Sequence, residues 1–108
     1  MKITYSIQVC NESRELYSLL NFLTRVIDDE DYIDVIVDSN NTTEKVELVL
    51  KHFEDRITVH KRAFDTFDKN SQFHTDVAKG EYVFHIDADE LPQQSLIKLL
   101  KQVISETG

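Results

Sequence analysis

Apolar positions change their spacing several times along the first half of the chain. Ile3–Val9 alternates apolar and polar residues and includes β-branched members, which predicts a strand. Apolar residues then recur at helical spacing over residues 16–27. A short, nearly continuous apolar run at residues 33–37 is typical of a strand covered on both faces, and a second helical pattern follows over about residues 43–53. The first half therefore predicts strand, helix, strand, helix.

The second half repeats this alternation. Residues 57–60 predict a third strand, and a short helix from about Ser71 ends at Gly80, where a left-handed cap is the usual role of glycine. Residues 82–86 predict a fourth strand, and Pro92 begins a last helix with an apolar stripe. The order predicts an α/β fold, a Rossmann-like three-layer α/β/α arrangement with a mainly parallel four-stranded sheet. At 108 residues, we expect residues 1–108 to form a single domain.

Polar residues follow each predicted strand. The four groups are Cys10, Asn11 and Glu12; Asp38 and Ser39; His60, Lys61 and Arg62; and Asp87, Ala88 and Asp89. In open parallel sheets, ligands bind outside the carboxyl ends of the strands, where the strand order reverses. We therefore expect these four strand exits to form one site.

The fourth exit is a tight cluster of acids, Asp87, Asp89 and Glu90. Like-charged carboxylates raise each other's pKa, and a divalent metal ion with hard oxygen ligands removes that cost. His85 would reach the same ion if the strand stays extended, although a histidine in a strand is more often packed or hydrogen-bonded. The alternative is a solvated acidic turn before a helix.

Charge and composition exclude several classes of function. The net charge of −8 leaves no basic stripe for nucleic acid. The single Cys10 excludes an internal disulfide and a cysteine-type zinc site, and no His/Asp pattern marks it as a nucleophile. No glycine-rich phosphate loop occurs, and an EF-hand loop beginning at Asp87 fails because Pro92 takes its glycine position. No signal peptide or membrane span is evident, so we expect a cytoplasmic protein.

Three segments together resemble the nucleotide-binding half of a GT-A glycosyltransferase of family 2, in a truncated or minimal form. They are residues 9–13 (Val-Cys-Asn-Glu-Ser), residues 35–42 (Val-Ile-Val-Asp-Ser-Asn-Asn-Thr) and residues 78–90 (Ala-Lys-Gly-Glu-Tyr-Val-Phe-His-Ile-Asp-Ala-Asp-Glu). The third segment is the most specific, because it adds a helix end and a strand to the bare Asp-x-Asp (DXD) motif. The order and spacing of all three match, and the resemblance covers nearly the whole chain.

The resemblance implies a metal-dependent enzyme that binds a UDP-sugar donor and transfers the sugar to an unknown acceptor, or hydrolyses it. Asp89 would be a direct ligand of Mn²⁺ or Mg²⁺. Asp87 would contact the ribose or a metal-bound water, with Ala88 between them in the donor site. The metal would stabilise the charge that develops on the nucleoside diphosphate as the sugar leaves.

The residues that follow the first two predicted strands would hold the nucleoside. By the same resemblance, Asp38 would hydrogen-bond the base, with Ser39 beside it. Glu12 and the backbone around Cys10 and Asn11 would hold the uridine.

The chain also departs from the family pattern. Ser39 stands where members often carry a second Asp, and Ser71 and Gln72 stand where a basic residue or Asn is common. The family's catalytic carboxylate lies in an acceptor half downstream of these segments, so no catalytic base can be assigned; Glu90 is a weak local candidate. The alternative function is a non-catalytic nucleotide-sugar-binding or assembly module. In it, the sheet edge beside the last strand pairs with a second copy, as a homodimer, or with a partner chain.

Overall fold

The structure is a computed structural model that describes residues 2–64, 67–80 and 82–89. Glu90 and the helix predicted from Pro92 lie outside these residues. The elements in chain order are β1 (Ile3–Val9), α1 (Ser13–Val26), β2 (Tyr32–Asp38), α2 (Glu44–His52), β3 (Thr58–Arg62), α3 (Phe67–Val77) and β4 (Tyr82–Asp87).

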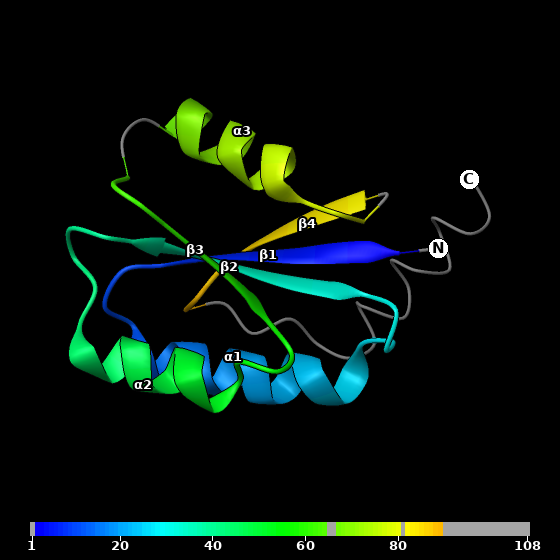
Figure 1. Ribbon diagram of the computed structural model, residues 1–108, viewed down its shortest axis with the longest axis horizontal. Helices are drawn as coiled ribbons and strands as arrows, with labels where there is room; N and C mark the ends of the chain where they lie inside the picture. Colours follow the sequence, from blue (N-terminus) through cyan, green and yellow to red (C-terminus); the bar gives the residue numbers. More distant parts are fainter. Residues whose placement is uncertain (1, 65–66, 81, 90–108) are drawn as a thin grey trace.

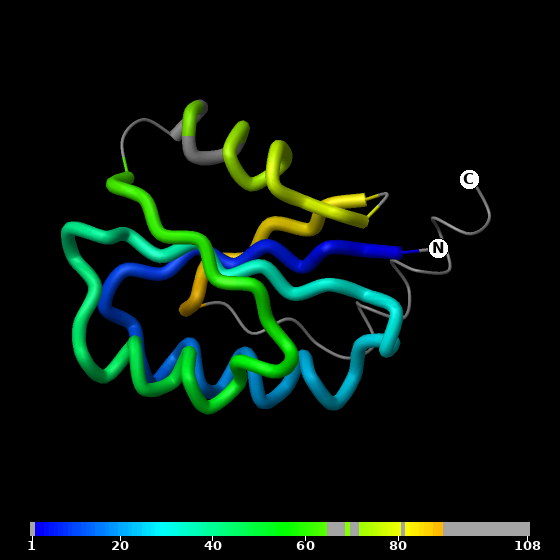
Figure 2. The backbone as a smooth tube through the Cα atoms, viewed as in Figure 1, coloured from blue at the N-terminus to red at the C-terminus, as the bar shows by residue number. Residues whose placement is uncertain are grey.

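The four strands form one all-parallel sheet in the order β3-β2-β1-β4. Helices α1 and α2 cover one face of this sheet and α3 covers the other (Figure 1). The predicted three-layer α/β/α fold is therefore confirmed. The strand order reverses at β1, so β1 and β4, from opposite ends of the chain, run side by side (Figure 2).

The two faces of the sheet differ because β1 alternates apolar and polar side chains. The apolar set packs against α1 and α2 in a buried core that contains Ile3, Tyr5, Ile7 and Val9 of β1, Leu16, Leu19, Leu20 and Leu23 of α1, and Val46 and Leu50 of α2. Thr4 and Ser6 point the other way and are also fully buried. Thr4 forms a hydrogen bond with Gly80, and Ser6 forms one with His74. The face of the sheet beneath α3 is therefore a polar layer.

The predicted boundaries differ most around α3. This helix begins at Phe67 rather than near Ser71, and it buries His74 more completely than Phe73 or Val77. Strand β3 extends to Arg62, two residues beyond its predicted end. The end of β3 was difficult to predict because its last residues are polar. Such residues show no alternation of apolar and polar positions that would mark them as part of a strand.

The predicted left-handed cap at Gly80 is wrong, since no glycine in the described residues has a positive φ. Glycine is needed there because the chain passes very close to β1. An added Cβ would lie 2.8 Å from the carbonyl oxygen of Lys2 and 2.8 Å from the backbone nitrogen of Thr4. At this approach, the Gly80 N–H donates a hydrogen bond of 2.8 Å to Thr4 Oγ1.

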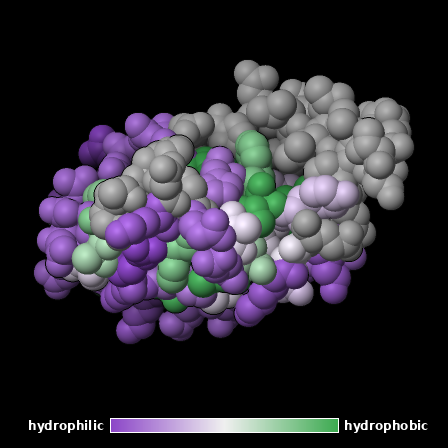
Figure 3. Space-filling view, turned by 90° about the horizontal axis from the view of Figure 1, so that it is seen from above, coloured by the Kyte–Doolittle hydropathy of each residue, from purple (hydrophilic) through white to green (hydrophobic). Residues whose placement is uncertain are grey.

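The surface on the α3 side is mostly hydrophilic, with hydrophobic side chains showing near the middle of this view (Figure 3). This agrees with the net charge of −8. Within the described ranges, no helix has the length and apolar character that crossing a membrane requires.

Candidate functional site

Because the strands are parallel, their carboxyl ends meet at one edge of the sheet, as predicted from the order of the elements. A cleft of about 230 Å³ opens at this edge, between the exits of β1 and β4. Its lining consists of Gln8, Val9, Cys10, Glu12, Phe64, Asp87, Ala88 and Asp89. This is the point where the strand order reverses, the position at which open parallel sheets bind ligands.

The β4 wall of the cleft presents two carboxylates. Ala88 is only 3 % exposed, and its backbone N–H donates to the carbonyl oxygen of Gln8 at 3.1 Å. Asp87 and Asp89, on either side of it, are exposed. Gln8 also orients the first acid, because its Nε2 donates to Asp87 Oδ1 at 2.7 Å. Both acids therefore face solvent at the cleft, and one of them is held by its neighbour on β1.

These two acids fit a divalent cation that is shared with a phosphate ligand. Mg²⁺, for example, is commonly held by one or two carboxylates together with substrate phosphates and waters. Among the described residues, no three His, Cys, Asp or Glu side chains gather into a complete protein site. The cleft could thus supply Asp87 and Asp89 as ligands, with the other oxygens coming from the bound molecule and water.

The β1 wall is shaped by a local turn. Glu12 lies at the N-cap position of α1, and its side chain turns back so that Oε2 accepts a hydrogen bond of 2.9 Å from Cys10 N. Burial, followed by the charges of Glu12 and Asp38, raises the pKa of the Cys10 thiol to about 11. The thiol therefore stays protonated at neutral pH.

The expected nucleoside-binding residues separate into two groups. Cys10 and Glu12 line the cleft, whereas Asn11, Asp38 and Ser39 do not. Asn11 and Ser39 are exposed, and Asp38 is buried behind the cleft. A hydrogen bond from the Asn41 side chain is the largest influence lowering the pKa of Asp38, so this acid is ionised.

His85, the third candidate metal ligand, does not line the cleft either. It points toward α3, where its ring lies against that of His74, with centroids 4.9 Å apart and ring planes inclined by 32°. His74 is buried and hydrogen-bonded to Ser6 through Nδ1. The structure thus places His85, which is exposed, beside His74 of α3.

The basic cluster predicted to follow β3 lies within that strand and lines no part of the cleft. Lys61 forms a 2.9 Å ion pair with Glu47 of α2, and the Arg62 guanidinium lies 4.8 Å from the ring centre of Phe73 in α3. The exit of β3 is instead occupied by Phe64, which the sequence analysis missed. The sequence gives little sign of this position, because Phe64 can be recognised as a strand-exit residue only if β3 is known to end at Arg62.

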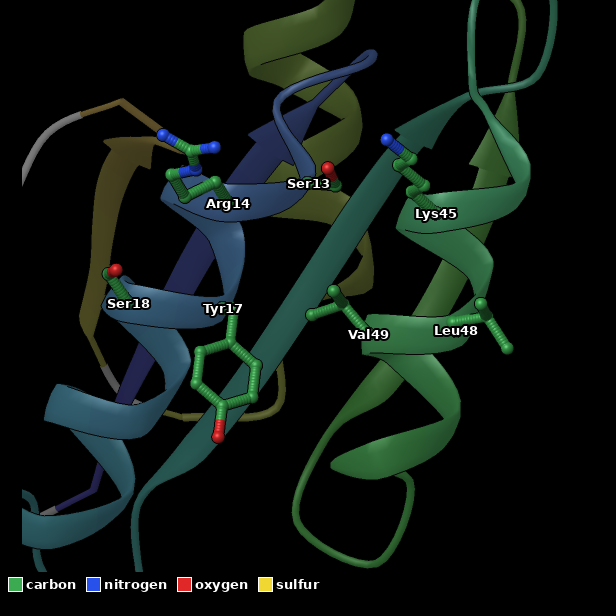
Figure 4. A pocket seen from close by; sticks show the side chains of 7 residues that line it. All are labelled: Ser13, Arg14, Tyr17, Ser18, Lys45, Leu48 and Val49. Atoms are coloured by element: carbon green, nitrogen blue, oxygen red, sulfur yellow. The ribbon is translucent and has the colours of Figure 1, made fainter.

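Two other clefts hold none of the residues expected to bind the donor or the metal, and Lys61 of the basic cluster lines one of them. The groove between α1 and α2, about 280 Å³, is lined by Ser13, Arg14, Tyr17, Ser18, Lys45, Leu48 and Val49 (Figure 4). Arg14 and Lys45 lie at the same end of it, and no carboxylate lines it. A third hollow, about 440 Å³, lies between α2 and β3. Neither offers the paired exposed acids of the first cleft.

No protein-family model matches the chain, and no curated protein matches it in sequence. Among solved structures, it is similar to the mannosyltransferase PcManGT from Pyrobaculum calidifontis in complex with GDP-Man and Mn²⁺. The TM-score is 0.74 at 16 % sequence identity, and the match covers 88 % of this chain. The chain spans 30 % of the length of that protein. The chain therefore has a glycosyltransferase-like fold.

Proposed function

We propose that this chain binds a nucleoside-diphosphate sugar together with Mn²⁺ or Mg²⁺ and acts in glycosyl transfer. The observation that carries the proposal is the cleft at the strand reversal. There, the exposed carboxylates of Asp87 and Asp89 flank the buried Ala88 and face the exit of β1. The glycosyltransferase-like fold and the resemblance of the three sequence segments support the same function.

In this proposal the two walls of the cleft hold different parts of the donor. Asp87 and Asp89 would hold the cation, which would offset the charge of the leaving diphosphate. Without a cation, these acids and the net charge of −8 would repel a diphosphate. Glu12 fixes the backbone at Cys10, and this turn borders the nucleoside end.

The resemblance favours UDP as the nucleotide, whereas the structural neighbour was solved with GDP-Man. We propose a UDP-sugar as donor and treat guanosine diphosphate as the competing ligand. The difference can be measured directly, because both nucleotides share the diphosphate and differ in the base.

A second candidate is a donor-binding module whose acceptor site and base come from another polypeptide. The described residues that line the cleft account for donor binding alone, because none of them is assigned to an acceptor. No described residue is assigned as catalytic base, and Glu90 remains a candidate from the sequence alone. Strand β4 is an outer strand of the described sheet, so the predicted pairing with a second copy or a partner chain would take place along it.

Calorimetric titration of UDP and GDP, each with and without Mn²⁺, tests the binding proposal. We expect metal-dependent binding that Asp89→Asn abolishes. Asp55→Asn is the matched control, because Asp55 is an exposed acid in the turn between α2 and β3, at the opposite edge of the sheet. If neither nucleotide binds the wild-type chain with Mn²⁺, or if both variants behave alike, the proposal is wrong.

Release of UDP from a UDP-sugar then separates the two candidates. An enzyme releases UDP in a metal-dependent way that Asp89→Asn stops, and an acceptor increases the rate. A module binds the donor without turnover until its partner chain is added.

A further inference from the structure

Asp38 is a buried acid whose carboxylate is fully occupied by the protein. Asp38 is only 4 % exposed. Oδ1 accepts hydrogen bonds from the backbone N–H groups of Asn40 at 3.1 Å and Phe64 at 3.5 Å. Oδ2 accepts from Asn41 Nδ2 at 2.6 Å and from Cys10 Sγ at 3.6 Å. A carboxylate offers about four lone-pair sites, so these donors leave none for a ligand.

The donors belong to three different strand exits. One follows β1, two follow β2 and the last, Phe64, follows β3. A backbone hydrogen bond of 2.9 Å from Ser39 N to the carbonyl oxygen of Arg62 joins the exits of β2 and β3 a second time. Because Asp38 is ionised, its bonds are charge-assisted and stronger than neutral ones. Asp38 therefore fixes Phe64 relative to the exit of β1.

Phe64 is the aromatic residue among those that line the cleft. It is half-buried, so part of its side chain remains open to a ligand. Every nucleobase has a π face that stacks on an aromatic ring, and such stacking tolerates different bases. Asp87 and Asp89 lie on the β4 wall, whereas Glu12, the acid at the β1 exit, accepts a hydrogen bond from Cys10 N through Oε2. The cation and diphosphate are therefore expected on the β4 wall, which leaves the wall formed by Phe64 and the β1 exit for the base.

We propose that Phe64 is the stacking surface for the nucleobase and that Asp38 is a positioning residue, which acts on the ligand only through Phe64. This inference rests on the proposed function and changes the role expected for Asp38 from the sequence. A direct hydrogen bond from Asp38 to the base would first require one of its four protein bonds to break.

A tryptophan reporter tests the stacking directly. The chain contains no Trp, so Phe64→Trp introduces a single fluorophore at the cleft. We expect UDP and GDP with Mg²⁺, which does not quench fluorescence as Mn²⁺ does, to change its emission, whereas inorganic pyrophosphate with Mg²⁺ leaves it unchanged. An emission that is unchanged by a nucleotide whose binding calorimetry detects would overturn the inference.

Truncation measures the contribution of the ring. Phe64→Ala should weaken UDP binding about tenfold, the size expected for one stacked base, and leave binding of Mn²⁺-pyrophosphate unchanged. Tyr17→Ala is the control, because it removes an exposed aromatic ring from the groove between α1 and α2. An equal loss for UDP and pyrophosphate would mean that Phe64 only supports the fold.

A double-mutant cycle tests the role of Asp38. Asp38→Asn replaces one carboxylate oxygen by an amide nitrogen. The two donors that bond to that oxygen then lose their acceptor. We expect it to weaken UDP binding in the wild-type background and to add little in the Phe64→Ala background. Equal losses in both backgrounds would show that Asp38 acts independently of Phe64 and would overturn its positioning role.

Circular dichroism confirms that each variant is folded. The Phe64→Trp measurement decides the stacking proposal even if Asp38→Asn does not fold.

Failure of this inference differs from failure of the proposed function. Nucleotide binding that is insensitive to Phe64 overturns the inference and leaves the proposed function standing. A wild-type chain that binds neither the nucleotides nor pyrophosphate with Mn²⁺ overturns both.

Discussion

His74 should make the protein less stable as the pH falls below neutrality. His74 is 2 % exposed, and its ring forms a hydrogen bond with Ser6 of β1, which lies beneath α3. Burial lowers the pKa of His74 from 6.5 to about 4. The charges of its neighbours His85, Arg62 and His60 act in the same direction, and that of Asp87 opposes them. Protonating this ring in the folded protein is therefore unfavourable.

The size of the effect follows from linkage. Between pH 6.5 and about 4, the unfolded chain binds a proton at this histidine that the folded chain does not, so stability falls as the pH falls. The shift corresponds to about 3 kcal/mol once the pH is below both values, and to about 2 kcal/mol at pH 5. Burial raises the pKa of Asp34, which acts in the opposite direction because its folded form takes up a proton more readily. The contribution of His74 must therefore be measured as a difference between variants.

Urea denaturation at pH 7 and pH 5, in EDTA, provides the measurement. His74→Asn removes the titrating ring while its amide keeps a hydrogen-bonding partner for Ser6. From pH 7 to pH 5, the wild-type free energy of unfolding should fall by about 2 kcal/mol more than that of the variant. His52→Asn, at an exposed histidine of α2, should retain the wild-type pH dependence. If His74→Asn shows the same pH dependence as the wild type, the reasoning from burial is wrong.

Two further predictions concern the strand exits and the approach to β4. Gly80→Ala should lower the free energy of unfolding by about 1–3 kcal/mol, because the new Cβ would lie 2.8 Å from the carbonyl oxygen of Lys2; a stability in urea equal to that of the wild type would contradict this close approach. The Cys10 thiol, with its pKa raised to about 11, should react with a thiol reagent at pH 7 much more slowly in the folded protein than in urea. Equal rates in the two states would show that the thiol is not shielded by Asp38 and Glu12.

The sequence was informative where the hydrophobic period is strong. Strand β1 has the predicted limits, Ile3–Val9, and the alternation of strands and helices led to the observed parallel sheet. The period is weak where a strand runs over polar neighbours. Arg62 was interpreted as a residue of a strand exit because it is polar, yet it belongs to β3 and its guanidinium lies over the ring of Phe73 in α3.

Predicting the candidate site met a different limit. The pattern Asp-Ala-Asp after an apolar strand was enough to place two acids at the sheet edge, and the structure adds that both are exposed. Sequence could not show that the Asp38 oxygens join three strand exits, because two of the donors, Cys10 and Phe64, come from distant segments. Nor could it show that His85 turns toward His74. Residue type predicts the chemistry available at a position, whereas hydrogen-bond occupancy depends on the fold.

The polar positions of β1 explain how the far end of the chain is aligned with the cleft. Thr4 accepts the hydrogen bond from Gly80 N, Ser6 bonds to His74, and Gln8 donates to Asp87 at 2.7 Å. Each polar side chain thus holds a later segment: the approach to β4, helix α3 and the end of β4. The pairing of Gln8 with Asp87 is also the last step of the β1–β4 register. A shift of that register by one residue would turn Asp87 to the other face of the sheet. The alternation that marks β1 as a strand therefore also fixes the face on which Asp87 meets Gln8.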